Sequence, residues 1–571
     1  MPDGNQTPER PLDRMIHPGS GRRHAPPTPK GRQPDPQRLE EVREVLGDNP
    51  RERDWLIENL HRVQDRFGHL HAAHLAALAE EMKLPLAVVF EVASFYAHFD
   101  VVMDGEEPPA PLTVRVCDSI SCEMTGAQEI LKQLPAVVGD NVRVVRAPCM
   151  GRCACAPVAE VGHGFVDNGD VHSIAQAVRT GRTEPVIPTY TAYDVYTAHG
   201  GYQLLRDCYA GRWDADTIIN KLSDAKLRGL GGAGFPTGKK WSIVRQQKHP
   251  RYVAINADEG EPGTFKDRWI FEEDPHRFLE GMLLGAWATE AAACYIYLRD
   301  EYPQCQEILE REIAKVEAAG LTNGCPIYLR RGAGAYICGE ESAMLESIEG
   351  KRGLPRHKPP FAAEVGLWGK PTVTNNVETM YWVRDIVERG PDWFAGHGRH
   401  ERTGLRLYSV SGRVKEPGVK LAPAGTTLRE LVEEYAGGML DGQTLKGYLP
   451  GGASGGILPE SMADIPLDFG TLEEHGCFLG SGAIVVFSNR DNMKDVALNL
   501  MRFFEDESCG QCTPCRNGTE KTVKLLEQDN WDPTLLGDLS TVMRDASICG
   551  LGQAAPNPID SVFKFFPEDL Q

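Results

Sequence analysis

The first apolar pattern along the chain has the spacing of a helix. Four large apolar side chains would share one of its faces: Leu56, Leu60, Val63 and Phe67. Pro85 is placed to open a further helix that runs through Val89 to Phe95. The pattern therefore predicts an N-terminal helical region over residues 39–103.

A pattern typical of strands follows an acidic, proline-rich linker at residues 104–111. Apolar and polar side chains alternate over Leu112–Cys117, and Val142–Val145 is a β-branched run. Val158–Val166 is typical of a hairpin, because two glycines interrupt it. We expect a small α/β unit over residues 112–185.

Three further blocks complete the chain. Residues 190–400 hold glycine loops between three strand-like runs, namely Tyr252–Ile255, Tyr295–Leu298 and Ile327–Leu329. Residues 401–488 hold short β runs. Residues 490–571 are expected to be helical, with four apolar side chains on one face: Val496, Leu500, Met501 and Phe504.

Residues 1–38 differ from the rest of the chain. They hold nine prolines and seven Lys or Arg residues, but almost no large apolar side chains. Such a segment cannot bury enough surface to order itself, which predicts a disordered arm. The alternative is an arm that lies on a partner subunit. The acidic body of the chain would also attract such an arm.

Charge and hydropathy exclude some functions. The net charge of −20 argues against a nucleic-acid binder, which needs a positive face for phosphates. No stretch reaches the roughly 18 uninterrupted apolar residues of a membrane helix, so we expect no membrane span. The N-terminus has no basic-then-apolar signal pattern, so we expect the chain to remain in the cytoplasm.

Eight of the 15 cysteines form two sets of four. In a reducing compartment, clustered cysteines favour metal binding over disulfides. The C-terminal set has three close members and one distant member: Cys509, Cys512, Cys515 and Cys549. Two-residue gaps let three thiolates converge on a cubane that the fourth closes, which favours [4Fe–4S]. Zinc is the alternative, but it usually takes two separated pairs of ligands.

The N-terminal set consists of two pairs: Cys117 with Cys122, and Cys149 with Cys153. Each pair follows a strand-like run, so the two loops that carry them could converge. Four thiolates in two pairs suit a [2Fe–2S] cluster, which needs two per iron. Zinc bound by four thiolates is the alternative, and Cys155 is a fifth candidate ligand.

Three loops are candidate nucleotide sites. In Arg228–Trp241, repeated glycines let backbone N–H groups approach a phosphate, and the following lysines add charge. Its glycines spell GxGxxG, but no strand-like run leads into them, so the Rossmann context is missing. A flexible turn is the alternative for this loop.

The other two loops are rich in acids. Asn256–Gly263 places three carboxylates directly after a strand, in a turn that glycine and proline fix. Gly332–Ser342 leads into a helix, and a glycine loop before a helix N-terminus is an anion site. Its paired acids suggest recognition of ribose or ribityl hydroxyls. For either acid taken singly, the alternative is that its charge stabilises the helix dipole.

Together these motifs resemble a known family. Gly332–Ser347 (GAGAYICGEESAMLES) and Glu507–Gly518 (ESCGQCTPCRNG) look like the two signatures of the NADH-binding flavoprotein subunit of respiratory complex I. The resemblance covers residues 190–571. Residues 39–185 resemble the thioredoxin-like [2Fe–2S] subunit of the same module, so two normally separate subunits look fused.

The resemblance implies an α/β multidomain fold. Its parts are a helical plus thioredoxin-like ferredoxin domain, a Rossmann-like FMN/NAD domain, a ubiquitin-like β-grasp (soluble-ligand-binding) domain and a C-terminal helical bundle with the [4Fe–4S] cluster. The positions that match the family's FMN site are Gly229, Gly231, Lys240, Asn256, Asp258, Tyr336, Gly339, Glu340, Asn375, Asn376 and Thr379. Those that match its NAD site are Phe235, Glu259, Glu261, Glu341, Lys358 and Phe361. Ile243 departs from relatives that often carry an aromatic there, which leaves adenine stacking to Phe235 and Phe361.

The resemblance also implies a diaphorase, in which electrons pass reversibly between iron–sulfur clusters, FMN and NAD⁺. No side chain need act as acid or base, and Glu261 is the nearby candidate. Whole-chain resemblance favours the β (diaphorase) subunit of a soluble NAD-dependent formate dehydrogenase. Its partner would be a catalytic α subunit with a molybdenum or tungsten pterin and further iron–sulfur clusters. The alternative is the diaphorase subunit of a bidirectional hydrogenase or of a complex I-type module, although the chain ends soon after Cys549, without the ferredoxin extension of some hydrogenase-linked relatives.

Overall fold

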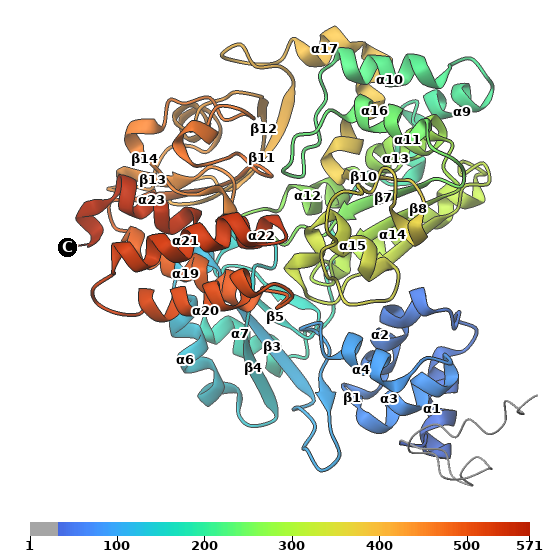
Figure 1. Ribbon diagram of the computed structural model, residues 1–571, viewed down its shortest axis with the longest axis horizontal. Helices are drawn as coiled ribbons and strands as arrows, with labels where there is room; N and C mark the ends of the chain where they lie inside the picture. The colour runs from blue at the N-terminus through green and yellow to red at the C-terminus, as the bar shows by residue number, and fades with distance from the viewer. Residues whose placement is uncertain (1–31, 571) are drawn as a thin grey trace, which may run out of the picture.

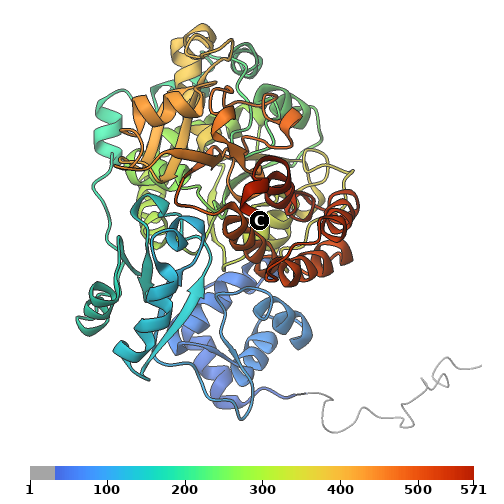
Figure 2. The same cartoon turned by 90° about the vertical axis from the view of Figure 1, so that its left-hand side faces the viewer.

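The computed structural model describes residues 32–570 and has the multidomain α/β architecture that the sequence predicts. In both views the N-terminal helices (blue) lie at one end of the molecule and the β-rich domain (orange) at the other (Figures 1 and 2). The C-terminal helices (red) pack between that β-rich domain and the thioredoxin-like unit (cyan) in Figure 1. No helix among the described residues is both long and apolar enough to cross a membrane.

The N-terminal region is helical, and the predicted apolar stripe is buried, with Leu56, Leu60 and Val63 at 0% exposure. Its elements are α1 (Pro36–Leu46), α2 (Leu56–Phe67), β1 (Leu70–His71), α3 (Ala72–Glu81), α4 (Leu86–Ala93) and β2 (Val101–Val102). The predicted arm lies outside the described residues up to position 31, and its last residues already open α1, whose N-cap is Asp35. The two-residue strands pair in parallel, which no periodicity could predict.

The thioredoxin-like unit is built on a four-stranded sheet of order β4-β3-β5-β6. Its elements are β3 (Leu112–Cys117), α5 (Ile120–Glu123), α6 (Ala127–Val138), β4 (Val142–Ala147), β5 (Ala159–Val161), β6 (Gly164–Val166) and α7 (Val171–Arg179). The antiparallel pair β5–β6 is the expected hairpin. Because β3 and β4 are parallel neighbours, their carboxyl ends bring Cys117 and Cys149 to the same edge.

The flavin domain has a parallel sheet of order β10-β7-β8-β9. Its strands are β7 (Tyr252–Ala257), β8 (Ala293–Leu298), β9 (Ile327–Arg331) and β10 (Thr372–Asn376). Its helices are α8 (Tyr193–Ala198), α9 (Gln203–Tyr209), α10 (Ala215–Asp224), α11 (Thr237–Arg245), α12 (Lys266–Glu273), α13 (Pro275–Thr289), α14 (Pro303–Ala318), α15 (Glu341–Ile348), α16 (Val377–Arg389) and α17 (Pro391–Ala395). Ligands of such sheets bind beyond the carboxyl ends of the strands, where all three candidate loops lie.

The last two regions are a β domain and a helical bundle. The β domain has a five-stranded sheet of order β12-β11-β15-β13-β14. Its elements are β11 (Leu405–Gly412), β12 (Gly418–Pro423), α18 (Leu428–Glu430), β13 (Leu445–Leu449), β14 (Leu458–Pro459) and β15 (Ala483–Ser488). The bundle comprises α19 (Met493–Asp506), α20 (Thr513–Leu526), α21 (Pro533–Ala546), α22 (Gly550–Ala554) and α23 (Asn557–Phe565). The predicted apolar face of α19 is buried in the core.

Candidate functional site

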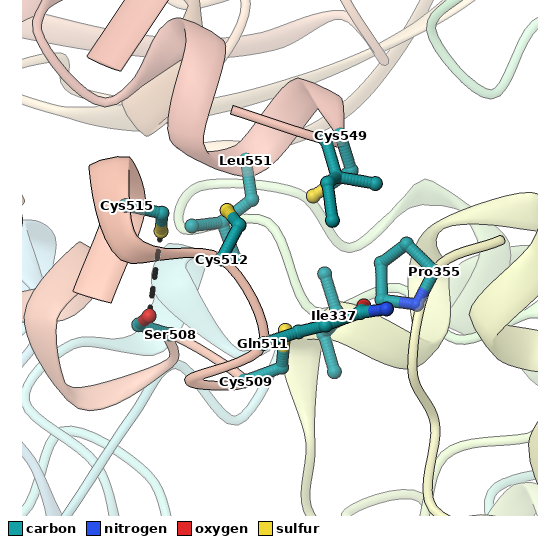
Figure 3. Close-up of a pocket in the computed structure, with 10 residues that line it drawn as sticks. Ile337, Pro355, Ser508, Cys509, Gln511, Cys512, Cys515, Cys549 and Leu551 are labelled. Atoms are coloured by element: carbon teal, nitrogen blue, oxygen red, sulfur yellow. Dashed lines mark hydrogen bonds between the residues drawn. The ribbon is translucent and has the colours of Figure 1, made fainter. Parts of the chain in front are cut away.

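The four C-terminal cysteines line one pocket between the helical bundle and the flavin domain (Figure 3). Cys509 and Cys512 lie on the loop before α20, Cys515 lies in its first turn, and Cys549 is the N-cap of α22. The other side chains of the lining are Ile337, Pro355, Ser508, Gln511, Ile548 and Leu551. The pocket is mostly apolar apart from its sulfur atoms, and this suits a bulky metal–sulfur core.

The chemistry of these thiols also suits a cluster. Burial raises the pKa of Cys515 to about 12 and that of Cys549 to about 11. Neighbouring thiols of the set add to both shifts, so the sulfur atoms lie close enough to influence one another. Such thiols keep their protons at neutral pH in the absence of metal. A cationic metal centre displaces these protons when it binds, so binding releases protons.

The N-terminal cysteines meet at the edge of the thioredoxin-like sheet, where all four are buried. The Sγ atoms of Cys149 and Cys153 are 3.2 Å apart. Hydrogen bonding to Cys117, burial and the charges of Cys153 and Cys149 raise the pKa of Cys122 well above its usual value. Cys155, the fifth candidate, is half-exposed, and its pKa responds to burial and to Asp167 rather than to the other cysteines.

The spacing of the C-terminal set still favours a cluster over zinc, because three of its cysteines lie on one loop and helix start, whereas zinc usually takes two separated pairs of ligands. Within residues 32–570, no group of three or more His, Cys, Asp or Glu side chains is arranged to hold a single metal ion.

The glycine loop and the carboxyl ends of β7 and β10 form a cradle for a flavin. A Cβ atom on Gly231 would lie 2.9 Å from the Cβ of Asn376, so only glycine lets the loop approach β10 this closely. The Leu230 backbone N–H donates to Thr379 Oγ1 at 2.9 Å, which anchors the loop on α16. Gly229 closes the same loop through a hydrogen bond from its N–H to the Phe235 carbonyl at 2.9 Å.

The acidic loop after β7 meets the loop before α15. Asn256 Nδ2 donates to the Gly339 carbonyl at 2.8 Å. A Cβ on Gly339 would lie 3.2 Å from the Asp258 carbonyl oxygen. Asp258 Oδ2 is buried and has no hydrogen-bond partner, and burial raises the pKa of this carboxyl well above its usual value. A buried oxygen without a partner in a glycine-lined cradle fits a ligand hydroxyl, so the residues present fit FMN.

Three more predicted FMN positions lie around this cradle. Lys240 Nζ donates to the Thr374 carbonyl at 2.8 Å and lies 3.9 Å from Glu341 Oε1, and burial lowers its pKa. Asn375 Oδ1 accepts from Trp241 Nε1 at 2.9 Å. Glu340 is the N-cap of α15, and its side chain accepts hydrogen bonds from the Ser342 and Ala343 N–H groups. This acid therefore caps the helix, which was the alternative to hydroxyl recognition. The structure thus brings the predicted FMN residues together at one edge of the sheet, and their contacts with FMN remain predictions.

The two rings proposed to stack on adenine are both exposed. Phe235 lies in the glycine loop and is 40% exposed, and Phe361, close to Lys358 in the sequence, is 55% exposed. Lys358 Nζ donates to Glu340 Oε1 at 2.7 Å and lies 3.5 Å from Glu341 Oε2. Lys358, Glu340 and Glu341 therefore form a charged cluster at the start of α15, and such a cluster suits a dinucleotide.

Two of the predicted NAD residues are held inside the protein instead. Glu259 accepts hydrogen bonds from the Asp267 and Arg268 backbone and from Tyr302, and burial raises its pKa to about 7. Glu261 accepts from the Ser454 N–H and hydroxyl at 2.7 Å and from the Tyr336 hydroxyl. In this arrangement both carboxylates tie loops together, and their role toward NAD remains a prediction.

Sequence reasoning missed the contacts that join the sites. Tyr336 N–H donates to Glu507 Oε2 at 2.9 Å, which links the loop before α15 to the cysteine loop. The Arg299 guanidinium donates to the carbonyls of Glu259 at 2.6 Å and Cys149 at 2.7 Å. Lys266 is fully buried between Asp267, Glu378 and Asn376. Tyr336 and Glu507 lie within the quoted motifs, but no spacing rule indicates contacts across domains.

The fold and site define the class of a multidomain iron–sulfur flavoprotein, and comparison with known families agrees. Residues 222–385 match the Nuo51 FMN-binding domain, and residues 42–182 match the thioredoxin-like [2Fe–2S] ferredoxin. Residues 407–458 match the SLBB domain. Residues 495–571 match the NADH-ubiquinone oxidoreductase-F iron–sulfur binding region.

Similar proteins give the family. The chain is 44% identical to the F 2 subunit of the Rhizobium meliloti NADH-quinone oxidoreductase, over 66% of this chain and 94% of that protein. It is 42% identical to the F subunit of the Aquifex aeolicus enzyme, over 67% of this chain and 92% of that protein. The chain belongs to the family of these NADH-quinone oxidoreductase F subunits. A chain of the NAD⁺-reducing [NiFe]-hydrogenase in its H₂-reduced state superposes with a TM-score of 0.81 at 31% identity, over 91% of this chain and 93% of that one.

The coarse function follows from this membership. The chain is a subunit of an NAD-dependent oxidoreductase and has the domains for FMN, a [2Fe–2S] cluster and a [4Fe–4S] cluster. The F subunits match about two thirds of the chain, whereas the hydrogenase chain matches 91% of it. The fused organisation expected from the sequence therefore has a counterpart in a solved structure.

Proposed function

We propose that the chain carries electrons between the Cys509–Cys549 pocket and NAD(H), through FMN held at the carboxyl edge of the flavin sheet. The observation that supports this most strongly is a shared wall. Ile337 lines the cysteine pocket, and Gly339, two residues further on, accepts a hydrogen bond from Asn256 in the flavin cradle. One short segment thus contacts both proposed sites.

The residues of the cradle would bind and orient FMN. When bound, FMN exchanges a hydride with NAD(H) and single electrons with a cluster, chemistry that no side chain supplies. The N–H groups of the glycine loop and the Lys240 ammonium would hold the phosphate. Asp258 would accept a hydrogen bond from a hydroxyl of the ribityl chain, and Thr379 and Asn376 would keep the loop in place.

The exposed rings and the charged cluster at the start of α15 would bind the dinucleotide. We assign adenine stacking to Phe235 and Phe361, because both rings are exposed and Phe235 lies in the glycine loop. Lys358 would neutralise part of the diphosphate charge, and Glu341 would accept hydrogen bonds from ribose hydroxyls. Glu259 and Glu261 would hold the loops that face the nicotinamide, so we propose no acid or base among the side chains.

The partner is proposed from resemblance to known complexes. The formate-linked interpretation, with a molybdenum or tungsten pterin subunit, rests on whole-chain resemblance. The similar proteins named above belong to NADH-quinone oxidoreductases and to an NAD⁺-reducing hydrogenase, and they favour the alternative of a hydrogenase-linked or complex I-type module. We therefore propose a heteromeric NAD-linked complex in the cytoplasm, with a hydrogenase-type partner as the first candidate and a formate dehydrogenase as the second.

The test is purification of the native complex from its source. Acid precipitation should release FMN into the supernatant, whereas FAD, or flavin that stays in the pellet, would contradict the proposed cradle. Mass spectrometry should identify the co-purifying subunits, and metal analysis should find nickel for the first candidate or molybdenum or tungsten for the second. Reduction of NAD⁺ by H₂ but not by formate would support the hydrogenase-type partner, and the reverse result would support the formate-linked one.

A further inference from the structure

Two cysteines outside both cluster sets lie side by side at the amino edge of the flavin sheet. The Sγ atoms of Cys294 and Cys325 are 3.8 Å apart. Cys294 is the second residue of β8, and its backbone N–H donates to the Pro326 carbonyl at 2.9 Å. Cys325 N–H donates to the Thr322 carbonyl at 2.9 Å. Backbone hydrogen bonds thus fix both residues, and their side chains face each other.

The two thiols differ in access. Cys294 is fully buried, whereas Cys325 is half-exposed and lines an open cavity of about 440 Å³. Cavities of about 300–1,000 Å³ commonly take small molecules. Tyr209, Trp287 and Asn323 contribute to its walls, and Arg245 adds a cationic group. A small reagent can therefore reach the Cys325 thiol from the cavity, whereas the Cys294 thiol is buried next to it.

The two thiols also differ in acidity, because hydrogen bonding to Cys325 and burial raise the pKa of Cys294 well above its usual value. A hydrogen bond from Cys294 lowers the pKa of Cys325 below its usual value, which outweighs the opposing effect of burial. The thiolate is the nucleophile in thiol–disulfide exchange, so the accessible thiol is also the more reactive one. Neither residue lies near the proposed cluster ligands in the sequence.

We propose that Cys325 and Cys294 form a redox-modification site for small disulfides of the glutathione type. The Cys325 thiolate attacks one sulfur of glutathione disulfide, which forms a mixed disulfide and releases one glutathione thiolate. The Cys294 thiol then attacks Cys325 Sγ, which releases the second glutathione and leaves a Cys294–Cys325 disulfide. Two protein thiols are oxidised, one glutathione disulfide is reduced, and the two protons pass to the two glutathiones.

The geometry allows a Cys294–Cys325 disulfide to form at the amino edge of the flavin sheet. The Sγ atoms must approach from 3.8 Å to the roughly 2.05 Å of a disulfide bond. The new bond would join the start of β8 to the turn before β9. The FMN loops follow the carboxyl ends of the strands, at the opposite edge of the sheet, so their contacts would remain. The inference therefore holds whether or not the proposed function is correct.

The test is incubation of the purified native complex with glutathione disulfide, followed by peptide mapping under non-reducing conditions. The wild type should yield a Cys294–Cys325 linked peptide pair that is lighter by two hydrogens, and a thiol reductant should restore it. In Cys294→Ala, a glutathionyl adduct should persist on Cys325, and Cys325→Ala should yield neither product. Cys208→Ala is the matched control, because Cys208 is buried beside Tyr209 of the same cavity, and the link should form as in the wild type.

The wild-type result alone can overturn the proposal, even if a variant fails to fold. The half-exposed Cys155 is the internal reference for an accessible thiol without a neighbouring partner. If Cys155 becomes glutathionylated while Cys294 and Cys325 both stay reduced, the pair is not a reactive site. A stable adduct on wild-type Cys325 without the linked product would also contradict it, because Cys294 would then fail to resolve the mixed disulfide.

Discussion

The two four-cysteine sites of this chain are built differently. The C-terminal site draws its cysteines from a loop and two helix starts, and Ile337 and Pro355 of the flavin domain complete its wall. The N-terminal site takes Cys117 from the end of β3, Cys122 from α5, and Cys149 and Cys153 from the segment after β4, and its four thiols are buried. It contacts the flavin domain through Arg299, which donates to the Cys149 carbonyl, and through Phe265, which packs against Cys149 and Cys153. We propose from this difference that the first site exchanges electrons with the flavin, whereas the second has a less direct role.

The largest effect should follow from Cys512→Ala. The variant should lose the [4Fe–4S] signal and nearly all partner-linked NAD⁺ reduction, because the electron path through the pocket is broken. NADH–ferricyanide activity should survive in part, since a small acceptor can take electrons from the flavin directly. Both activities and the low-temperature EPR spectrum should be measured on the purified complex.

Unfolding of the bundle is the competing explanation for this variant, because cluster binding and folding are coupled. Retained FMN and an unchanged melting profile would exclude it. Cys477→Ala is a suitable control, because this buried cysteine belongs to neither set and its loss should leave both activities intact. Wild-type partner-linked activity in a folded Cys512→Ala variant would contradict the proposed order of carriers.

The next effect concerns the link between the N-terminal site and the flavin domain. Arg299→Met should lower the free energy of unfolding by about 3–5 kcal/mol, since it leaves the buried Glu301 carboxylate, 2.9 Å from the guanidinium, without its partner. Arg502→Met is the control, because its exposed pair with Glu527 should contribute only about 0.2–1 kcal/mol. Equal losses in denaturant unfolding would show that Arg299 is not a structural link.

These comparisons also show how far sequence reasoning extends. Strand positions such as Leu112–Cys117 follow from alternation, and the structure has β3 at the same residues. Cysteine spacing predicted both four-cysteine sites, because ligand geometry is local. The Arg299–Cys149 and Tyr336–Glu507 hydrogen bonds could not be predicted, since they join residues more than a hundred positions apart. The burial of Glu259 was missed for a similar reason, because Tyr302 and α12 enclose it.

A smaller effect on activity is expected for Cys122→Ala. The variant should lose the [2Fe–2S] signal but keep a larger share of partner-linked NAD⁺ reduction than Cys512→Ala does. The reason is that no residue of this set lines the pocket that Ile337 shares with the flavin cradle. Steady-state rates of the two variants, each normalised to bound FMN, give the comparison. If Cys122→Ala loses as much as Cys512→Ala, the [2Fe–2S] cluster lies on the main path.

The smallest effect should appear in cofactor choice. The wild type should prefer NADH to NADPH in kcat/KM, because the Glu341 carboxylate near the ribose would repel a 2′-phosphate. Glu341→Gln should narrow this preference by raising NADPH activity while ferricyanide activity with NADH is largely kept. Glu346→Gln is the control, since this acid of the same helix pairs with Arg356 and Lys351, whereas Glu341 lies beside Lys240 and Lys358. Equal kcat/KM for both cofactors in the wild type would contradict the role of Glu341.

The contact between the C-terminal cysteine pocket and the flavin cradle is the central claim, and rapid-freeze EPR of the native complex tests it most directly. After the partner's substrate and NAD⁺ are mixed with the complex, samples frozen within a single turnover should show the [4Fe–4S] signal rise and decay at the rate of NADH formation. A [4Fe–4S] signal that stays constant while the [2Fe–2S] signal follows NADH formation would contradict the account.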